Sequence, residues 1–217
     1  MHRRTVTVLA AGAAVCAALV AAAIPAAAAG SVTIRNGNAD RHFAAYADSV
    51  TITDRTVGVH LTCPSSAGTH ASTMTGSIAG GTYAVPGRIG TLSVSFRQSC
   101  TTPLGAGTAT PLGQPYNLTI TGYDAAANTS VGYVGPVNVH ASATGCAFDM
   151  VGNVPAEYSN ATGVLSFTAN AGLPAGVARL APQNIMGCFG RVHVTDMLTL
   201  EADYHVSDPS PPLAITG

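Results

Sequence analysis

Six histidines and ten carboxylates follow residue 29, and these are the side chains of this sequence best suited to acid–base or metal chemistry. His60 and His140 each end a Val-x-Val-His segment, Val57–His60 and Val137–His140. If a pseudo-twofold axis relates the two segments, the imidazoles would approach each other and form a metal or acid–base binding site. Alternatively, each histidine lies on the solvent-facing side of a strand and has no ligand.

Glu201, Asp203 and His205 form a second candidate site, for a metal ion. They occupy alternate positions of one predicted strand, so their side chains share a face at spacings of about 6–7 Å. Such a set could bind a divalent cation if another element supplied further ligands. A solvent-exposed strand face of mixed charge explains these residues equally well, and the sequence predicts no cofactor.

Motifs of the common enzyme classes are missing from the sequence. It contains no G-x-S-x-G, H-E-x-x-H or P-loop motif. A glycosidase would need Glu157 or Glu201 paired with an aspartate, and no such pair is marked. The sequence therefore favours a non-catalytic protein over an enzyme. The alternative is a secreted hydrolase or protease inhibitor that acts through the long loops predicted at 64–75, 101–115 and 171–187, the second of which follows a cysteine.

Residues 1–29 have the features of a secretory signal peptide. Arg3 and Arg4 precede an apolar run from Val6 to Ile24, and Pro25 and four alanines complete a cleavage region. The run is also long enough to be an uncleaved membrane anchor, but the helix breaker and the small residues favour cleavage after Ala29. The predicted location is extracellular, and association with the cell wall is an open alternative.

Composition after residue 29 excludes two classes of partner. This part of the chain has seven arginines, no lysine and a net charge of about −3. It lacks the basic patch that nucleic acid requires and the polybasic cluster that attracts an anionic membrane. No membrane span is predicted after signal cleavage. The expected partner is an extracellular protein or polymer, and the sequence leaves the oligomeric state open.

Four cysteines remain after the signal peptide: Cys63, Cys100, Cys146 and Cys188. An even number in an exported chain predicts two structural disulfides. The C-x-x-C and H-x-H spacings that would favour zinc are absent. Cys16 lies within the apolar run and follows a valine, which argues against lipidation.

The order of residues after the signal peptide predicts an internal duplication, of about 31–124 and 125–207. Seven anchors recur in the same order, with different gaps between them. They are Val57–His60, Cys63, Gly76, Tyr83, Gly90–Ser93, Cys100 and Leu118–Tyr123, matched by Val137–His140, Cys146, Gly152, Tyr158, Gly163–Ser166, Cys188 and Leu198–Tyr204. A duplication predicts disulfides within each half, Cys63–Cys100 and Cys146–Cys188. The other two connectivities stay open on sequence grounds.

Alternation of apolar and polar residues is the dominant periodicity after residue 30, and it predicts half-buried strands. The clearest runs are 57–62, 92–97, 117–121 and 198–207. Phe43–Ala47 could begin a helix, but the β-branched residues that follow favour a strand. The predicted fold is an antiparallel β-sandwich or flattened barrel of about 10–13 strands. One fused domain, residues 30–207, is favoured over two tandem modules.

The last ten residues, 208–217, are predicted to form an exposed, flexible, Pro-rich tail. Within them, Leu213–Gly217 resembles the L-A-x-T-G pentapeptide that sortases of filamentous actinobacteria cleave. A sorting signal continues into an apolar segment and a basic tail, whereas this sequence ends at Gly217. Either the sequence is truncated or the match is accidental.

Taken as a whole, the chain resembles uncharacterised secreted all-β proteins of actinobacteria. The resemblance rests on the export signal, the lysine-free, hydroxyl-rich composition and the cysteine-framed repeat. It implies an extracellular β protein that binds a surface, a polymer or another protein.

Overall fold

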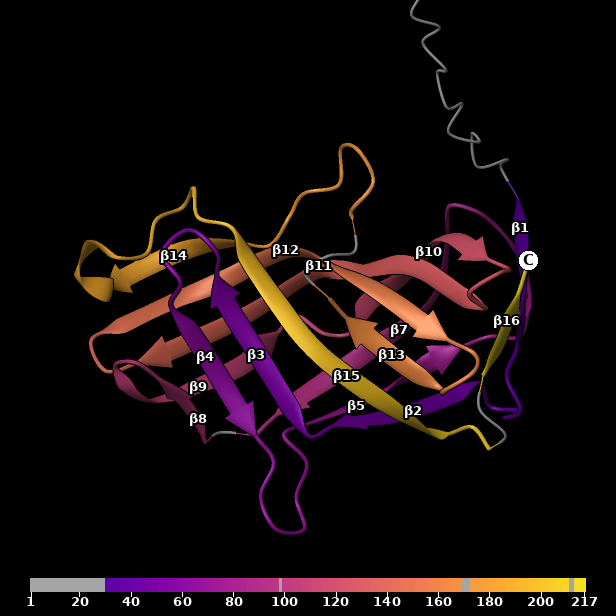
Figure 1. Ribbon diagram of the computed structural model, residues 1–217, viewed down its shortest axis with the longest axis horizontal. Coiled ribbons are helices and arrows are strands. Elements are labelled where there is room, and N and C mark those ends of the chain that lie inside the picture. The colour runs from indigo at the N-terminus through magenta and orange to yellow at the C-terminus, as the bar shows by residue number, and fades with distance from the viewer. Residues whose placement is uncertain (1–29, 98, 169–171, 211–212) are drawn as a thin grey trace, which may run out of the picture.

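The computed structural model describes residues 30–97, 99–168, 172–210 and 213–217, and the predicted signal peptide lies outside them. In these ranges the chain folds into sixteen β-strands and one short 3₁₀ helix (Figure 1). All strand pairings between neighbours in the sheets are antiparallel, so the predicted all-β class is confirmed. None of the described helical segments has the length and apolar character needed to cross a bilayer.

The strands and the helix are, in chain order, β1 (Ser31–Arg35), β2 (His42–Ala47), β3 (Ser49–Asp54), β4 (His60–Pro64), β5 (Ser72–Ile78), β6 (Gly81–Ala84), β7 (Gly87–Phe96), β8 (Cys100–Thr102), β9 (Gly105–Leu112), β10 (Tyr116–Asp124), β11 (Thr129–Ala143), β12 (Cys146–Ser159), β13 (Val164–Phe167), β14 (Ala181–Gly187), η1 (Cys188–Gly190), β15 (Leu198–Asp208) and β16 (Ala214–Thr216).

Three long strands, β11, β12 and β15, change partners along their length. The first part of β11 pairs with β10 and its second part with β9. Strand β12 pairs with β14 and then β13, while β15 pairs in turn with β3, β13 and β2. Because β11 also pairs with β12, and β15 with both β3 and β2, the thirteen-stranded sheet closes on itself. Strands β16, β1 and β6 form a separate small sheet at one end (Figure 1).

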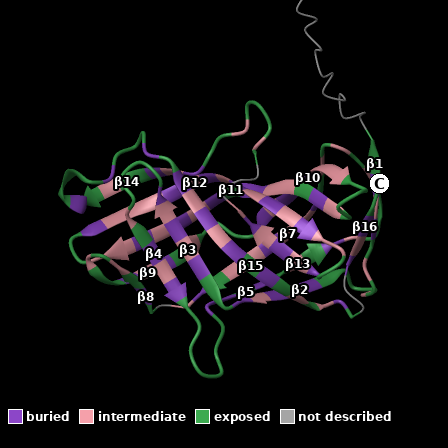
Figure 2. Cartoon of the chain, in the orientation of Figure 1, coloured by how far each residue is buried: buried purple, intermediate pink, exposed green. Residues whose placement is uncertain are grey.

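Alternation along the strands places one residue set in a common core (Figure 2). Phe43, Met74, Leu92, Met150 and Tyr204 are among the largest fully buried side chains. They come from both predicted halves, which therefore share one core. The Phe43–Ala47 segment is strand β2, as predicted. The internal duplication itself stays a prediction.

The strand predicted at 57–62 begins later than expected. Strand β4 starts at His60, and Val57 is 45 % exposed in the turn after β3. Asp54 causes this shift because its carboxylate accepts hydrogen bonds from the amides of Thr56 and Val57, which closes a turn. The chain therefore does not take up strand pairing until after Gly58.

Both predicted disulfides are present. Cys63–Cys100 joins β4 to β8, and Cys146–Cys188 joins the start of β12 to η1. The first bridge is buried in the main core, whereas the second belongs to a small apolar cluster with Val192. The two bridges thus hold different parts of the same end of the sheet.

The prediction of an exposed, flexible tail at 208–217 is wrong for the described residues 213–217. Residues Ala214–Thr216 form β16, which pairs with β1. Leu213 and Ile215 are each 4 % exposed and belong to the main core. Tyr158 and Asn160 also hold this segment, because their side chains donate hydrogen bonds to the carbonyls of Leu213 and Ile215. Burial of two large apolar side chains outweighs the disorder that a Pro-rich approach favours.

Truncating Ile215 tests whether this segment contributes to stability. Ile215→Ala should lower the free energy of unfolding by about 2–5 kcal/mol, because it removes buried carbon atoms and leaves a cavity. Thr216→Ala, at the exposed neighbouring position, should change it by less than about 0.5 kcal/mol. Urea unfolding followed by circular dichroism measures both values. Equal, small effects of the two substitutions would contradict a structural role for β16.

Candidate ligand-binding site

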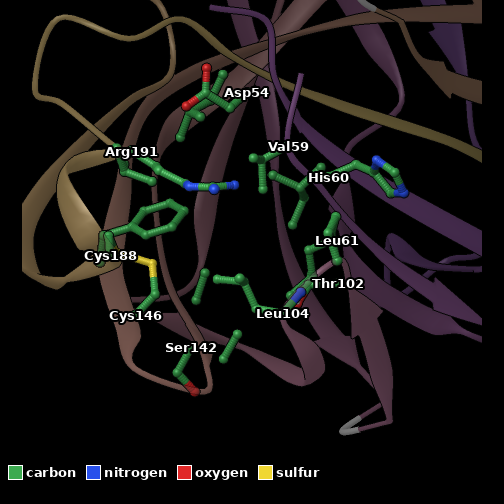
Figure 3. Close-up of a pocket in the computed structure, with 17 residues that line it drawn as sticks. Asp54, Val59, His60, Leu61, Thr102, Leu104, Ser142, Cys146, Cys188 and Arg191 are labelled. Atoms are coloured by element: carbon green, nitrogen blue, oxygen red, sulfur yellow. A yellow bond between two sulfur atoms is a disulfide. The ribbon is translucent and has the colours of Figure 1, made fainter. Parts of the chain in front are cut away.

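A cavity opens at the end of the sheet where β3, β4, β8, β11 and β12 meet η1 (Figure 3). We call it the end cavity, and its volume is about 70 Å³. Its lining is Ile52, Asp54, Val59, His60, Leu61, Thr102, Pro103, Leu104, Ala141, Ser142, Ala143, Cys146, Phe148, Cys188, Arg191, Val192 and Leu198. Since the lining runs from buried Ile52 to exposed Pro103, the cavity extends from the core to the surface.

Asp54 places a buried carboxyl group on the wall of the end cavity. Its side chain is 4 % exposed, and its Oδ1 accepts hydrogen bonds from the Thr56 and Val57 amides at 2.8 and 3.3 Å. Its Oδ2 is buried and receives no donor from another group. Burial raises the pKa of Asp54, and the neighbouring Asp196 carboxyl raises it further. A proton on Asp54 Oδ2, donated in a hydrogen bond to Asp196, would satisfy both carboxyl groups.

Asp196 is the buried partner of Asp54 and is 3 % exposed. Its Oδ2 accepts a hydrogen bond from the His193 amide at 2.7 Å and lies 3.6 Å from the His193 ring. A chain segment that buries two carboxyl groups side by side needs a proton or a cation between them. Of the two carboxyl groups, only that of Asp54 lines the end cavity, and Asp196 lies behind it.

Arg191 supplies a positive charge to the end cavity. Its guanidinium points between the labelled residues that line the cavity (Figure 3). Within the described ranges, this side chain makes no hydrogen bond and no ion pair. A guanidinium presents five donors in a planar fork that suits carboxylate or phosphate groups. At this position it is an available binding group for an anion.

The backbone next to Arg191 is strained. Cys188 and Phe189 both adopt left-handed conformations, with φ of 63° and 53°. Residues other than glycine pay about 1–3 kcal/mol for such conformations, so surrounding contacts must hold them. The Cys146–Cys188 disulfide does so, together with the hydrogen bonds from Cys188 N to Gly145 O and from Arg191 N to Cys188 O, both 2.9 Å. The turn fixes the point at which the Arg191 side chain leaves the backbone.

Exposed apolar side chains gather around this end of the molecule. Phe189 is 75 % exposed and lies against Gly145, where an added Cβ would come within 2.9 Å of its ring. Segment 191–197 meets the β3–β4 turn through a hydrogen bond from Arg55 N to Met197 O of 2.8 Å. Five of the large exposed apolar residues belong to these segments and to the end of β14: Val57, Met186, Phe189, Val194 and Met197. Such a group on an exposed surface is typical of a ligand or partner site.

The structure does not bring His60 and His140 together. His60 lies on β4 beside the end cavity and points away from it (Figure 3). His140 lies on β11, and β8 and β9 intervene between these two strands in the sheet. His140 Nδ1 instead lies 2.7 Å from Asp149 Oδ1, and Asn184 donates to the other carboxylate oxygen at 2.7 Å. The two histidines predicted to form one binding site therefore lie in separate environments.

Histidine–aspartate pairs are a recurrent feature of the surface. Four of the six histidines after residue 29 lie next to an aspartate. The pairs are His42–Asp208, His70–Asp48, His140–Asp149 and His193–Asp196. In the described part of the chain, no serine, threonine or cysteine side chain is hydrogen-bonded to any of these rings. The pairs thus provide two of the three groups of a catalytic triad without an adjacent nucleophile.

Glu201, Asp203 and His205 share the outer face of β15, as predicted, but have different partners. Glu201 lies 4.0 Å from the Arg55 guanidinium, and Asp203 accepts a hydrogen bond from Ser166. The His205 ring lies 5.6 Å from the Tyr46 ring. Across the described residues, no group of three or more such side chains has the geometry to hold a metal ion.

Of the long loops predicted at 64–75, 101–115 and 171–187, the second is mainly strand, because β8 and β9 occupy most of it. Strands β5 and β14 begin at Ser72 and Ala181, so 65–71 and the described residues 172–180 lie outside the named strands. Residues 65–71 remain as a hairpin loop that projects from the sheet next to Cys63 (Figure 1). The alternation of small and hydroxyl residues in β9 is too weakly apolar to indicate a strand from the sequence alone.

Comparison with protein-family models, with curated proteins and with solved structures found no match.

Asp54 and Asp149 should give opposite pH dependences of stability. The pKa of Asp54 is raised in the folded state, so its stabilising contribution is present below the unfolded pKa of about 4 and is lost as pH rises. Relative to the wild type, Asp54→Asn should therefore gain stability as pH rises from about 4 toward neutrality, because the amide keeps its donor when the shared proton of the wild type dissociates. Urea unfolding across this pH range measures the difference.

Asp149→Asn is the matched control. Hydrogen bonds from Asn184 and then His140 lower the pKa of Asp149 in the folded state. Its stabilising contribution is present above the unfolded pKa and is lost as pH falls through the lowered value. Relative to the wild type, Asp149→Asn should therefore lose stability as pH rises toward the unfolded pKa of about 4, because only the wild type gains the hydrogen bonds of the ionised carboxylate. The same direction of change for both variants would contradict the shared proton of Asp54 and Asp196.

Proposed function

We propose that this protein is a secreted, non-catalytic binding protein that holds a small apolar ligand in the end cavity. The observation that carries the proposal is a cavity that is continuous from the core to a surface rich in exposed apolar residues. Binding sites for small molecules are typically concave, mainly apolar and supplied with a few polar groups. Asp54 and Arg191 are the charged groups that fit this description.

Three features support an extracellular location. Two disulfides fit an oxidising compartment. Residues 1–29 have the composition of a cleaved signal peptide. A surface with few charges and many hydroxyl groups agrees with both. Cell-wall attachment through Leu213–Gly217 would require β16 to leave β1, so we propose that the protein is released.

Binding of a neutral apolar dye tests the proposal. N-phenyl-1-naphthylamine should bind the purified protein with a fluorescence increase, because its six-carbon phenyl ring matches the capacity of the mainly apolar end cavity and can enter it. Ala143→Leu adds three carbon atoms to the cavity wall and should weaken this binding at least tenfold. Ala126→Leu makes the same chemical change at an exposed turn and should leave binding unchanged. Circular dichroism checks that both variants fold.

Two results would overturn this function. One is the absence of any fluorescence increase with the folded wild type. The other is equal binding to the wild type and to Ala143→Leu, because the dye would then occupy a different surface. Native mass spectrometry of the protein purified from culture medium complements the titration, since a bound natural ligand would add a defined mass.

A second candidate function, inhibition of a protease, is supported by the projecting loop 65–71. Its ends are held by the Cys63–Cys100 disulfide, by a hydrogen bond from Ser65 N to Asp48 O and by one from Arg97 N to Ala71 O. A rigid loop beside a disulfide is a frequent way to occupy a protease cleft. Stoichiometric inhibition of a secreted protease that disappears when Ser66–Thr69 is replaced by Gly-Asn would favour this function. Inhibition that survives the replacement would exclude the loop.

A further inference from the structure

We infer that the ligand of the end cavity is a medium-length acyl chain with an anionic head group, bound through Arg191. This inference rests on the proposed function and specifies its ligand. The apolar walls take the chain, and the Arg191 guanidinium pairs with the head group at the mouth of the cavity.

The charges around the cavity favour an anionic ligand over a cationic one. Asp54 and Asp196 are the carboxyl groups on this side, and His60 and His193 are the nearby histidines. One oxygen of Asp54 is already occupied by two backbone amides, and burial beside Asp196 favours a proton on the other. Ionising both acids to bind a cation would place two negative charges side by side in an apolar wall, which is unfavourable.

Arg191, in contrast, needs no rearrangement to bind. It makes no side-chain hydrogen bond or ion pair with the described residues, so an incoming anion breaks no such contact. The disulfide-held turn at Cys188 and Phe189 fixes the start of its side chain. Because the backbone at this point is already held, only the side chain loses conformational freedom when the head group binds. A guanidinium also binds a carboxylate through two parallel hydrogen bonds.

The size of the cavity limits the length of the chain. A volume of about 70 Å³ corresponds to roughly five to seven water molecules, and a methylene group occupies about the space of one water. The cavity therefore holds about six methylene groups. Each one buried should strengthen binding by about fourfold until the cavity is full. Octanoate is the probe of matching length.

Three eight-carbon probes test how the charge of the head group affects binding. Octanoate, octan-1-ol and octylammonium share the chain and differ in charge, and each can be titrated as a competitor of the neutral dye. The wild type should bind octanoate at least tenfold more tightly than octan-1-ol and should bind octylammonium most weakly. Arg191→Gln should reduce the affinity for octanoate to that for octan-1-ol, while the affinity for the alcohol stays unchanged.

Arg88→Gln is the matched control. It removes the same charge from an exposed arginine on β7, a strand that does not line the end cavity. Within the described residues, Arg88 also lacks a side-chain hydrogen bond or ion pair, so the two substitutions differ in position and not in lost contacts. Octanoate binding by Arg88→Gln should equal that of the wild type.

The outcomes distinguish this inference from the proposed function. Equal affinities for octanoate and octan-1-ol, tighter binding of octylammonium, or an unchanged octanoate affinity in Arg191→Gln would each overturn the anionic head group. In those cases dye binding that Ala143→Leu abolishes would leave the proposed function standing. If neither the dye nor any probe binds to the folded wild type, both proposals fail.

Discussion

Partner exchange by the three longest strands is the constraint on which this structure depends. At about 3.3 Å per residue, β11 extends for roughly 50 Å. Strands β11 and β15 pair with β10 and β2 in one half of the molecule, where the sheet closes around the core. In the other half they pair with β9 and β3, and the sheet closes there as well. Large side chains such as Phe43 and Tyr204 fill the first half. In the second half, the wall of the end cavity includes small residues such as Ala141 and Ala143, which leave space open.

The second disulfide holds the segment that carries Arg191 beside the end cavity. Cys146–Cys188 attaches η1 to β12, and segment 191–197 then reaches across to the β3–β4 turn. Asp54 both closes that turn and lies on the cavity wall, while Arg191 follows the strained residues Cys188 and Phe189. A strained turn is kept only where the surrounding contacts over-determine it, and such turns are often found at functional sites. Here the bridge and two backbone hydrogen bonds provide those contacts.

Periodicity and the ordered anchors were enough to predict the all-β class, four strand regions and both disulfides. They were insufficient wherever a single polar side chain or a distant contact decides the outcome. Val57 fits an alternating pattern, but the Asp54 carboxylate turns the chain before it can pair. Leu213 and Ile215 follow prolines and appear tail-like, but β1 lies within reach in space. Asp54 and Arg191 are 137 positions apart in the sequence, and no local pattern indicates that they line one cavity.

Because the chain has few charged residues, it matters that Arg191 lies at the cavity without an acidic partner among the described residues. Every aspartate after residue 29 has a local partner: Asp40 and Asp124 cap turns, Asp48, Asp149 and Asp208 pair with histidines, Asp203 accepts from Ser166, and Asp54 and Asp196 lie together. No aspartate is therefore left to neutralise a guanidinium at the cavity. Because burying an unpaired charge is costly, Arg191 keeps an exposed position while its guanidinium points between the residues that line the cavity. The anionic ligand that we propose would bring its own apolar chain, so it would pair with the guanidinium and fill the cavity in one step.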